Sequence, residues 1–382
     1  PYRLGPDAAT IWEPSGKPVE NEYCTQGFTY TFVMERTATP ALPRRPDFYD
    51  DQVHGQYYSY EQARFNFPMI FTYRRIQGRI PGTGPEAIEI GDLSMQNWTW
   101  GNDWRLSTSA ADNFILTEGQ LQSSGQLDPG GWQGGLRPES LRLGEQHALG
   151  FFHWLVAGTS DFLLQQEDPD FQKDLYFRYG YVQGSDGPMG TASGLSKYPY
   201  IRESRRIIGR PSGAYPFGFT IYENDITTRE FEGQRNRPTI FYDSVGVGQY
   251  PIDFHECILP DFSTPEWGNK DAQAPSFPYQ IPLRALIPQQ IDNLLAGNKN
   301  IATSRIASGS YRVHPVEWAI GTAAGHTSVY ALQTGILPAE IPVLGADQQH
   351  HLDALQAQIQ DLANPIAFPG TTIFATEWAE PR

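Results

Sequence analysis

The chain has 382 residues, and its 39% hydrophobic and 13% aromatic content can fill a substantial core. Its 28 basic and 43 acidic side chains give a net charge of −15, which disfavours binding to nucleic-acid phosphate or to an anionic membrane surface. No run approaches the about 20 apolar residues that span a bilayer, so we expect no transmembrane segment. The two cysteines, Cys24 and Cys257, allow one disulfide but form no Cys-x-x-Cys site, and they leave the compartment open.

The first hundred residues predict strands joined by loops. Residues 26–36 alternate aromatic and polar side chains with the period of a half-buried strand. Residues 40–68 hold several prolines and many tyrosines, which is typical of an extended surface loop. The apolar runs at 69–76 and 88–94 predict further strands.

The middle and the end of the chain mix helices with long loops. Apolar residues recur at helical spacing through 138–166, so we expect a helix there despite its glycines. Residues 183–197 are rich in glycine, and 260–280 are rich in proline and aromatic residues, so both predict loops. A strand is expected at 281–287, and the Gln-rich segment 346–363 predicts an amphipathic helix.

The stretch 293–325, NLLAGNKNIATSRIASGSYRVHPVEWAIGTAAG, is the most informative part of the sequence. Its apolar residues around 294–304 predict a strand buried in a parallel sheet. Ser308-Gly309-Ser310 predicts a turn. Pro315, with Glu317 two residues later, favours a helix that begins near His314.

Small residues line one face of that expected helix. Gly321, Ala324 and Gly325 share the i, i+3, i+4 spacing. Glycine inside a helix costs up to about 1 kcal/mol relative to alanine, so the cluster indicates that a neighbouring backbone or a flat cofactor lies very close. The helix N-terminus can also hold negative charge. Simple packing on a sheet would give the same pattern, and both interpretations stay open.

Three blocks of the sequence resemble one family. They are the stretch 293–325, the segment YPYIRESRRIIG at 198–209 and the segment DSVGVGQYPIDFH at 243–255. All three, in this order, are similar to motifs of the FAD-dependent oxidoreductases with a glutathione-reductase-type FAD domain. The resemblance implies an FAD cofactor and hydride transfer from a small organic substrate, whose identity the sequence leaves open.

The resemblance is to the C-terminal portion of such proteins. No G-x-G-x-x-G fingerprint occurs, because Gly82-Thr83-Gly84 and Gly246-Val247-Gly248 both lack its third glycine. With a proline as the first residue, this predicts a partner, namely an N-terminal FAD-binding half on the same precursor or on another chain.

The resemblance also implies the fold class and the domains. The expected fold is mixed, α+β and α/β, with a β-rich substrate-binding domain and the closing strand-helix segment of a discontinuous Rossmann-like FAD domain. The expected boundaries are 1–285 for the substrate-binding domain, 286–336 for the FAD segment and 337–382 for a tail with one helix. A homo-oligomer is compatible with the sequence.

Three residues are candidates for the chemistry. His314 lies at the expected helix start beside the flavin, and His255 follows Asp253 at a spacing that places both on one face of a strand. Asp253 could then fix the tautomer of His255. Arg202 belongs to the densest basic cluster of the chain, with Arg205 and Arg206, and could bind an anionic substrate. Capping or packing histidines, and ion pairing with Glu203, are the alternatives.

The resemblance further implies a set of cofactor-contacting residues, and no metal site is expected because the histidines lack a ligand spacing. The set consists of Asn300, Ser304, Arg312, Val313, Pro315, Gly321 and Ala324.

Composition alone leaves two other functions open. The 9 Trp and 20 Tyr residues would suit a β-rich protein that binds or degrades carbohydrate. A flavin-free fragment with a structural or binding role is the second alternative.

Overall fold

The computed structural model divides the chain into two compact units. Unit 1 consists of Pro1–Thr25, Arg202–His255 and Leu259–Arg382, and unit 2 consists of Gln26–Ile201 and Glu256–Ile258. The structure describes residues 2–3, 23, 25–38, 45–51, 54, 57–59, 67–106, 109–157, 179–181, 184, 186–213, 215–227, 238–253, 255, 273–343, 349–361 and 364–367. Residues 202–255 and 286–336 thus share one unit, so the compact units do not follow the boundary expected at residue 285. The roles assigned to the three segments stay predictions.

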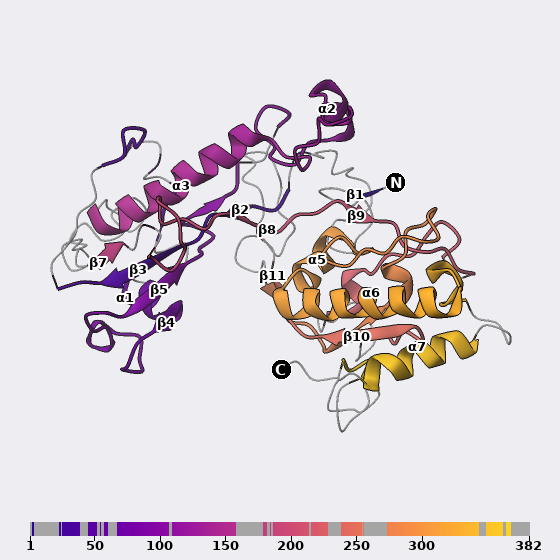
Figure 1. The fold of residues 1–382 in the computed structure, drawn as a ribbon. Coiled ribbons are helices and arrows are strands. Elements are labelled where there is room, and N and C mark those ends of the chain that lie inside the picture. Colours follow the sequence, from indigo (N-terminus) through magenta and orange to yellow (C-terminus); the bar gives the residue numbers. More distant parts are fainter. Residues whose placement is uncertain are drawn as a thin grey trace. The chain divides into compact units, whose positions relative to one another are not determined.

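Unit 2 is built on two antiparallel sheets and a long helix (Figure 1). The three-stranded sheet has the order β6 (Asp103–Trp104), β2 (Phe28–Thr29) and β8 (Tyr200–Ile201). The four-stranded sheet has the order β4 (Arg75–Gln77), β5 (Leu93–Gln96), β3 (Phe32–Arg36) and β7 (Tyr179–Tyr181). The helices among its described residues are α1 (Phe67–Tyr73), α2 (Glu118–Ser123) and α3 (Pro138–Ala157).

The glycines inside α3 allow close packing and do not break the helix. A Cβ built on Gly144 would collide with the ring of Phe28, and one on Gly150 would lie 2.6 Å from the Tyr58 hydroxyl oxygen. The predicted helix is therefore confirmed over 138–157, while 158–166 lie outside the described residues.

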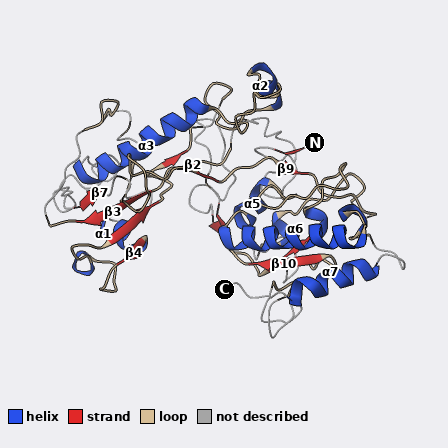
Figure 2. Cartoon of the chain, in the orientation of Figure 1, coloured by secondary structure: helices blue, strands red, loops and turns tan. Residues whose placement is uncertain are grey.

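The described residues of unit 1 form three two-stranded antiparallel sheets and three helices, several of which are drawn in Figure 2. The sheets pair β1 (Tyr2–Arg3) with β9 (Arg206–Ile207), β10 (Ser244–Gly248) with β13 (Tyr279–Pro282), and β11 (Ile252–Asp253) with β12 (Gln273–Ala274). The helices are α5 (Arg305–Tyr311), α6 (His314–Thr334) and α7 (Gln349–Asp361). Short 3₁₀ turns occur at Glu223–Asp225, Leu283–Ala285 and Pro338–Glu340, and unit 2 has one at Pro85–Ala87.

Helix α6 packs against β10, and α7 contacts both (Figure 1). The glycines of β10 make this approach close. A Cβ on Gly248 would lie 2.9 Å from a Val316 methyl carbon, and one on Gly246 would lie 3.6 Å from the Cβ of Ala319. The Gly-Val-Gly triplet therefore serves helix-on-strand packing here.

Several sequence predictions are confirmed. The segment 26–36 holds β2 and β3, α6 begins at His314, and α7 lies inside 346–363. Much of 40–68 and residues 260–272 lie outside the described residues.

Other predictions were wrong about element type or bounds. Residues 69–76 were expected to be a strand, but 67–73 form α1, and only 75–77 form a strand. A short apolar run fits a buried helix as well as a strand. The strand expected at 88–94 begins only at Leu93, and the one expected at 281–287 ends at Pro282 and continues as a 3₁₀ turn.

The stretch 293–325 is less regular than predicted. Residues 294–304 form turns with a single parallel bridge between Ile221 and Thr303, and Leu294 is half exposed, so the expected buried strand was wrong. The expected turn at Ser308-Gly309-Ser310 was also wrong, because these residues lie inside α5. The Ser304 hydroxyl accepts a hydrogen bond from the Ala307 N–H at 3.1 Å and so caps this helix.

Candidate functional site

Two helices meet at Arg312 and fix its position. Arg312 is the C-cap of α5, its N–H donates to the Ser308 carbonyl, and the next residue, Val313, is the N-cap of α6. Pro315 follows in the first turn of α6, where its missing N–H costs nothing. The Arg312 side chain is therefore anchored at the junction of two helices, with an exposed fraction of only 2%.

Arg312 binds the strand residue Asp253. Its Nη2 donates to the Asp253 backbone carbonyl at 2.6 Å and lies 3.7 Å from the carboxylate. The same carboxylate oxygen, Oδ2, lies 3.2 Å from Nε2 of His255. The predicted contact between Asp253 and His255 is thus made in the structure.

Positive charge around Asp253 keeps it ionised. Burial alone would raise the pKa of Asp253, but His255, Arg312 and Arg202 outweigh burial, and the pKa lies well below its ordinary value. The carboxylate can therefore accept hydrogen bonds throughout the physiological pH range. It holds His255 in one orientation, as carboxylates beside catalytic or metal-bound histidines do.

A second ion pair lies next to this group. The Lys299 ammonium is 3.4 Å from the Glu317 carboxylate, and both side chains are largely buried. Burial lowers the pKa of Lys299, and Arg312 and Arg202 lower it further, while Glu317 acts in the opposite direction. Arg202, Lys299 and Arg312 thus form a basic cluster beside the carboxylates of Asp253 and Glu317.

The neighbouring arginine, Arg206, has a structural role. Arg206 and Glu203 form a fully buried ion pair, and the Arg206 Nε donates to the Thr303 carbonyl at 3.1 Å. The ion-pairing alternative is therefore confirmed for Arg206. Arg202 is also buried, and its charge lowers the pKa of both Asp253 and Lys299.

The remaining predicted residues are spread over several environments. His314 and Pro315 are exposed at the start of α6. The Asn300 backbone carbonyl accepts a hydrogen bond from the Ile207 N–H at 3.0 Å. Ser304 is fully buried and donates to the Glu223 carboxylate at 3.2 Å.

Two of the three small residues on one face of α6, Gly321 and Ala324, pack against Gly297, whereas a Cβ built on Gly325 meets no atom within 4 Å. A Cβ built on Gly321 would lie 3.4 Å from the Gly297 carbonyl oxygen, and one built on Gly297 would lie 3.6 Å from the Cβ of Ala324. The close neighbour expected from the spacing of these residues is therefore the chain itself at Gly297.

Sequence reasoning missed the role of Lys299 and noted Glu317 only as a helix-start residue. No local spacing rule joins them, because they come from a turn and a helix. The available signal was a lysine flanked by Asn298 and Asn300 within the most informative stretch of an acidic chain.

The sequence was compared with models of known protein families. The model of the FAD dependent oxidoreductase family matches residues 16–359. The chain belongs to this family. As an FAD dependent oxidoreductase it is expected to work with flavin in a redox reaction, and the predicted FAD cofactor is confirmed at the level of the family. Nothing supports the carbohydrate alternative. Searches of curated proteins and of solved structures gave no match.

The residues around Arg312 suit one end of an FAD molecule. The isoalloxazine N1–C2=O edge becomes negative on reduction, and the basic cluster at the start of α6 supplies cations beside a positive helix end. The backbone N–H groups in the first turn of α6 offer few hydrogen bonds to such an anion. Pro315 has no N–H group, and those of Val316 and Glu317 donate to the Val313 carbonyl. The positive charge at this end of α6 therefore comes mainly from the side chains of Arg312 and Lys299.

Two further findings concern metal ions and membranes. Among the residues that the structure describes, no group of three or more His, Cys, Asp and Glu side chains could hold a metal ion. Within the same residues, no helix is both long and apolar enough to cross a membrane.

Proposed function

We propose that the chain carries the substrate-binding part and the flavin-contacting segment of an FAD-dependent oxidoreductase. The reaction is removal of a hydride from a C–H bond next to oxygen or nitrogen in a small organic substrate. One observation carries this proposal: Asp253 on β11 contacts both His255 and Arg312, and Arg312 directly precedes the N-cap of α6.

His255 is the proposed proton acceptor. When bound, FAD supplies the acceptor for the hydride. The proton released from the substrate O–H or N–H then passes to the imidazole ring of His255. Asp253 keeps this ring oriented and stabilises its positive charge after protonation. His314, exposed at the start of α6, is the second candidate for proton transfer.

Arg312 and Lys299 are the proposed partners of the anionic flavin edge. The charge of Arg202 lowers the pKa of both Asp253 and Lys299. Of the cofactor-contacting residues expected from the resemblance, Asn300, Val313 and Pro315 keep that proposed role beside Arg312. Ser304, Gly321 and Ala324 have contacts within the protein that account for them.

The resemblance also supports a partner. We propose that an N-terminal FAD-binding half, on the same precursor or on a separate chain, supplies the contacts to adenosine and pyrophosphate. The segment 286–336 would then complete that domain, and the β-rich unit 2 would contribute to substrate binding.

The first test is a visible spectrum of the natively purified protein before and after denaturation, with intact mass of every polypeptide present. Flavin released on denaturation, together with a second polypeptide, is the expected result. Material that has no flavin, and that binds no added FAD even with the N-terminal half present, would contradict the proposal.

The second test separates binding from chemistry. In flavin-containing protein, the His255→Gln variant should retain flavin but lose about 10²-fold or more in the rate at which an alcohol or amine substrate bleaches the flavin anaerobically. His326→Gln, a substitution on α6 outside the Asp253 group, is the matched control. Equal bleaching rates in His255→Gln and wild type would remove His255 from the reaction.

A further inference from the structure

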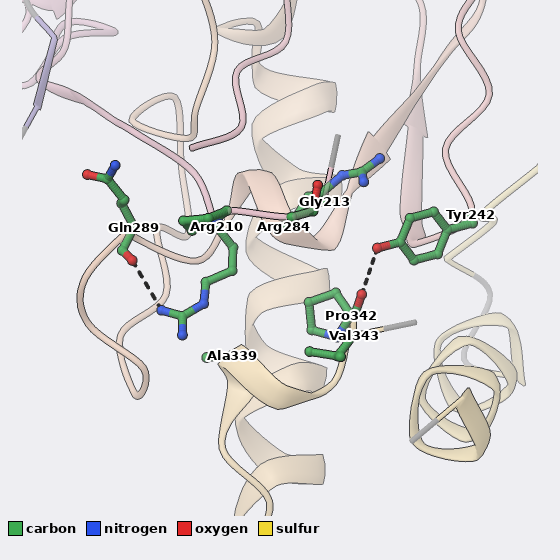
Figure 3. Close-up of a pocket in the computed structure, with 10 residues that line it drawn as sticks. Arg210, Gly213, Tyr242, Arg284, Gln289, Ala339, Pro342 and Val343 are labelled. Atoms are coloured by element: carbon green, nitrogen blue, oxygen red, sulfur yellow. Dashed lines mark hydrogen bonds between the residues drawn. The ribbon is translucent and has the colours of Figure 1, made fainter. Parts of the chain in front are cut away.

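Unit 1 contains a pocket that the proposed reaction does not use. Its volume is about 400 Å³, which is in the range of small-molecule sites. It is walled by residues 210–213, Tyr242, Arg284, Gln289 and part of 339–343 (Figure 3). None of these residues belongs to the group around Asp253.

The charged residues that line the pocket are both arginines, although the chain as a whole is acidic. Arg210 donates from Nη1 to the Gln289 carbonyl at 3.2 Å (Figure 3). It also pairs with the half-exposed Asp292 at 2.7 Å. Exposed ion pairs contribute little, so a ligand anion can compete with Asp292 for this guanidinium.

Arg284 is the second cation, and it is desolvated. Its guanidinium carbon lies 4.5 Å from the ring centroid of Phe219 and 4.8 Å from that of Tyr242, and its Nη2 lies 3.4 Å from the Asp243 carboxylate. Within the described part of the chain, neither the buried Arg284 Nε nor the buried Ser212 Oγ has a hydrogen-bond partner. Buried donors of this kind favour an acceptor brought by a ligand.

The rest of the pocket wall is apolar. Pro342 and Val343 lie between Arg210 and the Tyr242 ring in Figure 3, and Ala339 completes this side. The Tyr242 hydroxyl donates to the Pro342 carbonyl at 2.7 Å, which fixes the ring against the wall. The lining therefore combines hydrogen-bond donors and cations with a surface for a hydrophobic group.

We propose that this pocket binds a small amphipathic organic anion, with its carboxylate or phosphate group at Arg210 and Ser212 and its apolar body against Pro342 and Val343. Arginine suits the anionic group because its planar fork can give two hydrogen bonds to one carboxylate or phosphate. The proposal is independent of the flavin reaction.

Calorimetric titration of the full chain with phenyl phosphate tests the proposal, with inorganic phosphate and phenol as partial probes. Saturable binding of one phenyl phosphate per chain is expected, at least about tenfold tighter than binding of either partial probe. An absence of saturable binding would overturn the proposal. Inorganic phosphate that binds as tightly as phenyl phosphate would overturn the role of the apolar wall.

Two variants locate the binding. Arg210→Gln removes a cation from the wall, and Gly213→Leu adds bulk at a lining position where a built Cβ meets no atom within 4 Å, so the fold should be retained. Each should weaken phenyl phosphate binding at least about tenfold. Arg142→Gln and Gly119→Leu, at an exposed ion pair and at an open helix glycine, are the matched controls and should bind like wild type.

Binding that is equal in Gly213→Leu, Arg210→Gln and wild type would place the anion elsewhere and overturn the proposal. The titration is read out without flavin chemistry. Its failure would therefore leave the proposed oxidoreductase function untouched, and failure of the flavin test would leave this pocket untouched.

Discussion

Gly309 lies directly against the backbone of Asp253. A Cβ built on Gly309 would stand 3.0 Å from the Asp253 carbonyl oxygen and 3.3 Å from its nitrogen. That carbonyl accepts the hydrogen bond from Arg312, and β11 is paired with β12, so the backbone of Asp253 has little freedom to move away. The glycine within α5 thus sets the distance between the helix and the strand that carries the candidate site.

The Gly309→Ala substitution should therefore destabilise unit 1 by about 1–3 kcal/mol through overpacking. Gly325→Ala is the matched control, because Gly325 lies in α6 with no atom within 4 Å of a built Cβ. It should stabilise the protein by up to about 1 kcal/mol through helix propensity. Urea unfolding measures both changes. If the two substitutions have the same sign, the contact with Asp253 does not constrain α5.

Loss of Glu317 should destabilise the protein more than loss of its ion-pair partner Lys299. Glu317→Gln removes the carboxylate that pairs with Lys299, which stays buried near Arg312 and Arg202, whereas Lys299→Gln removes one of three like charges. We expect Glu317→Gln to cost about 1–3 kcal/mol and Lys299→Gln to cost clearly less. The measurement is urea unfolding of both single variants and the double variant. Equal costs would mean that the arginines do not act on Lys299.

Two ion pairs with the same i, i+3 spacing should contribute differently to stability because they differ in burial. The side chains of Glu203 and Arg206 are fully buried, whereas those of Glu139 and Arg142 are about half exposed. Removal of one buried partner leaves an uncompensated charge, so Glu203→Gln should cost about 3–5 kcal/mol. Glu139→Gln should change stability little. The free energy of unfolding of each variant, measured in urea, checks this, and a small effect of Glu203→Gln would contradict the buried pairing.

Helix α6 could be predicted because its signals are local. Pro315 lies in its first turn, and Gly335 adopts a left-handed conformation, with φ of 77°, at its C-terminal end. Proline at the start and glycine at the end are intrinsic preferences of a helix, so no tertiary contact is needed to read them.

Helix α5 and the basic cluster could not be predicted in the same way. Gly309 looks like a turn residue unless its contact with Asp253 is known. The contact between Asp253 and His255 was predicted because the two are separated by one residue, whereas Lys299 and Glu317 meet only through the tertiary fold. Arg312 was expected to face the cofactor, but its bond to the Asp253 carbonyl is likewise a long-range contact.

The stability of unit 2 should fall in mild acid because of His147. This α3 residue is buried beside Tyr58, whose hydroxyl donates to the His147 carbonyl at 2.8 Å, and burial lowers the pKa of His147 to about 4. In the unfolded chain the pKa is about 6.5, so between these values the unfolded state binds a proton that the folded state does not. The stabilisation is thus complete above about pH 6.5 and is lost as the pH falls toward 4.

Between about pH 7.5 and pH 5, this linkage should remove about 2 kcal/mol of stability from the wild type. The His147→Gln variant cannot titrate there, so its loss over the same interval should be smaller by that amount. Urea unfolding, followed by tryptophan fluorescence, gives both slopes. As a control, the two proteins should change in parallel between about pH 7.5 and pH 8.5, where the histidine is neutral in both states. Parallel behaviour in acid as well would show that His147 takes up its proton in the folded state.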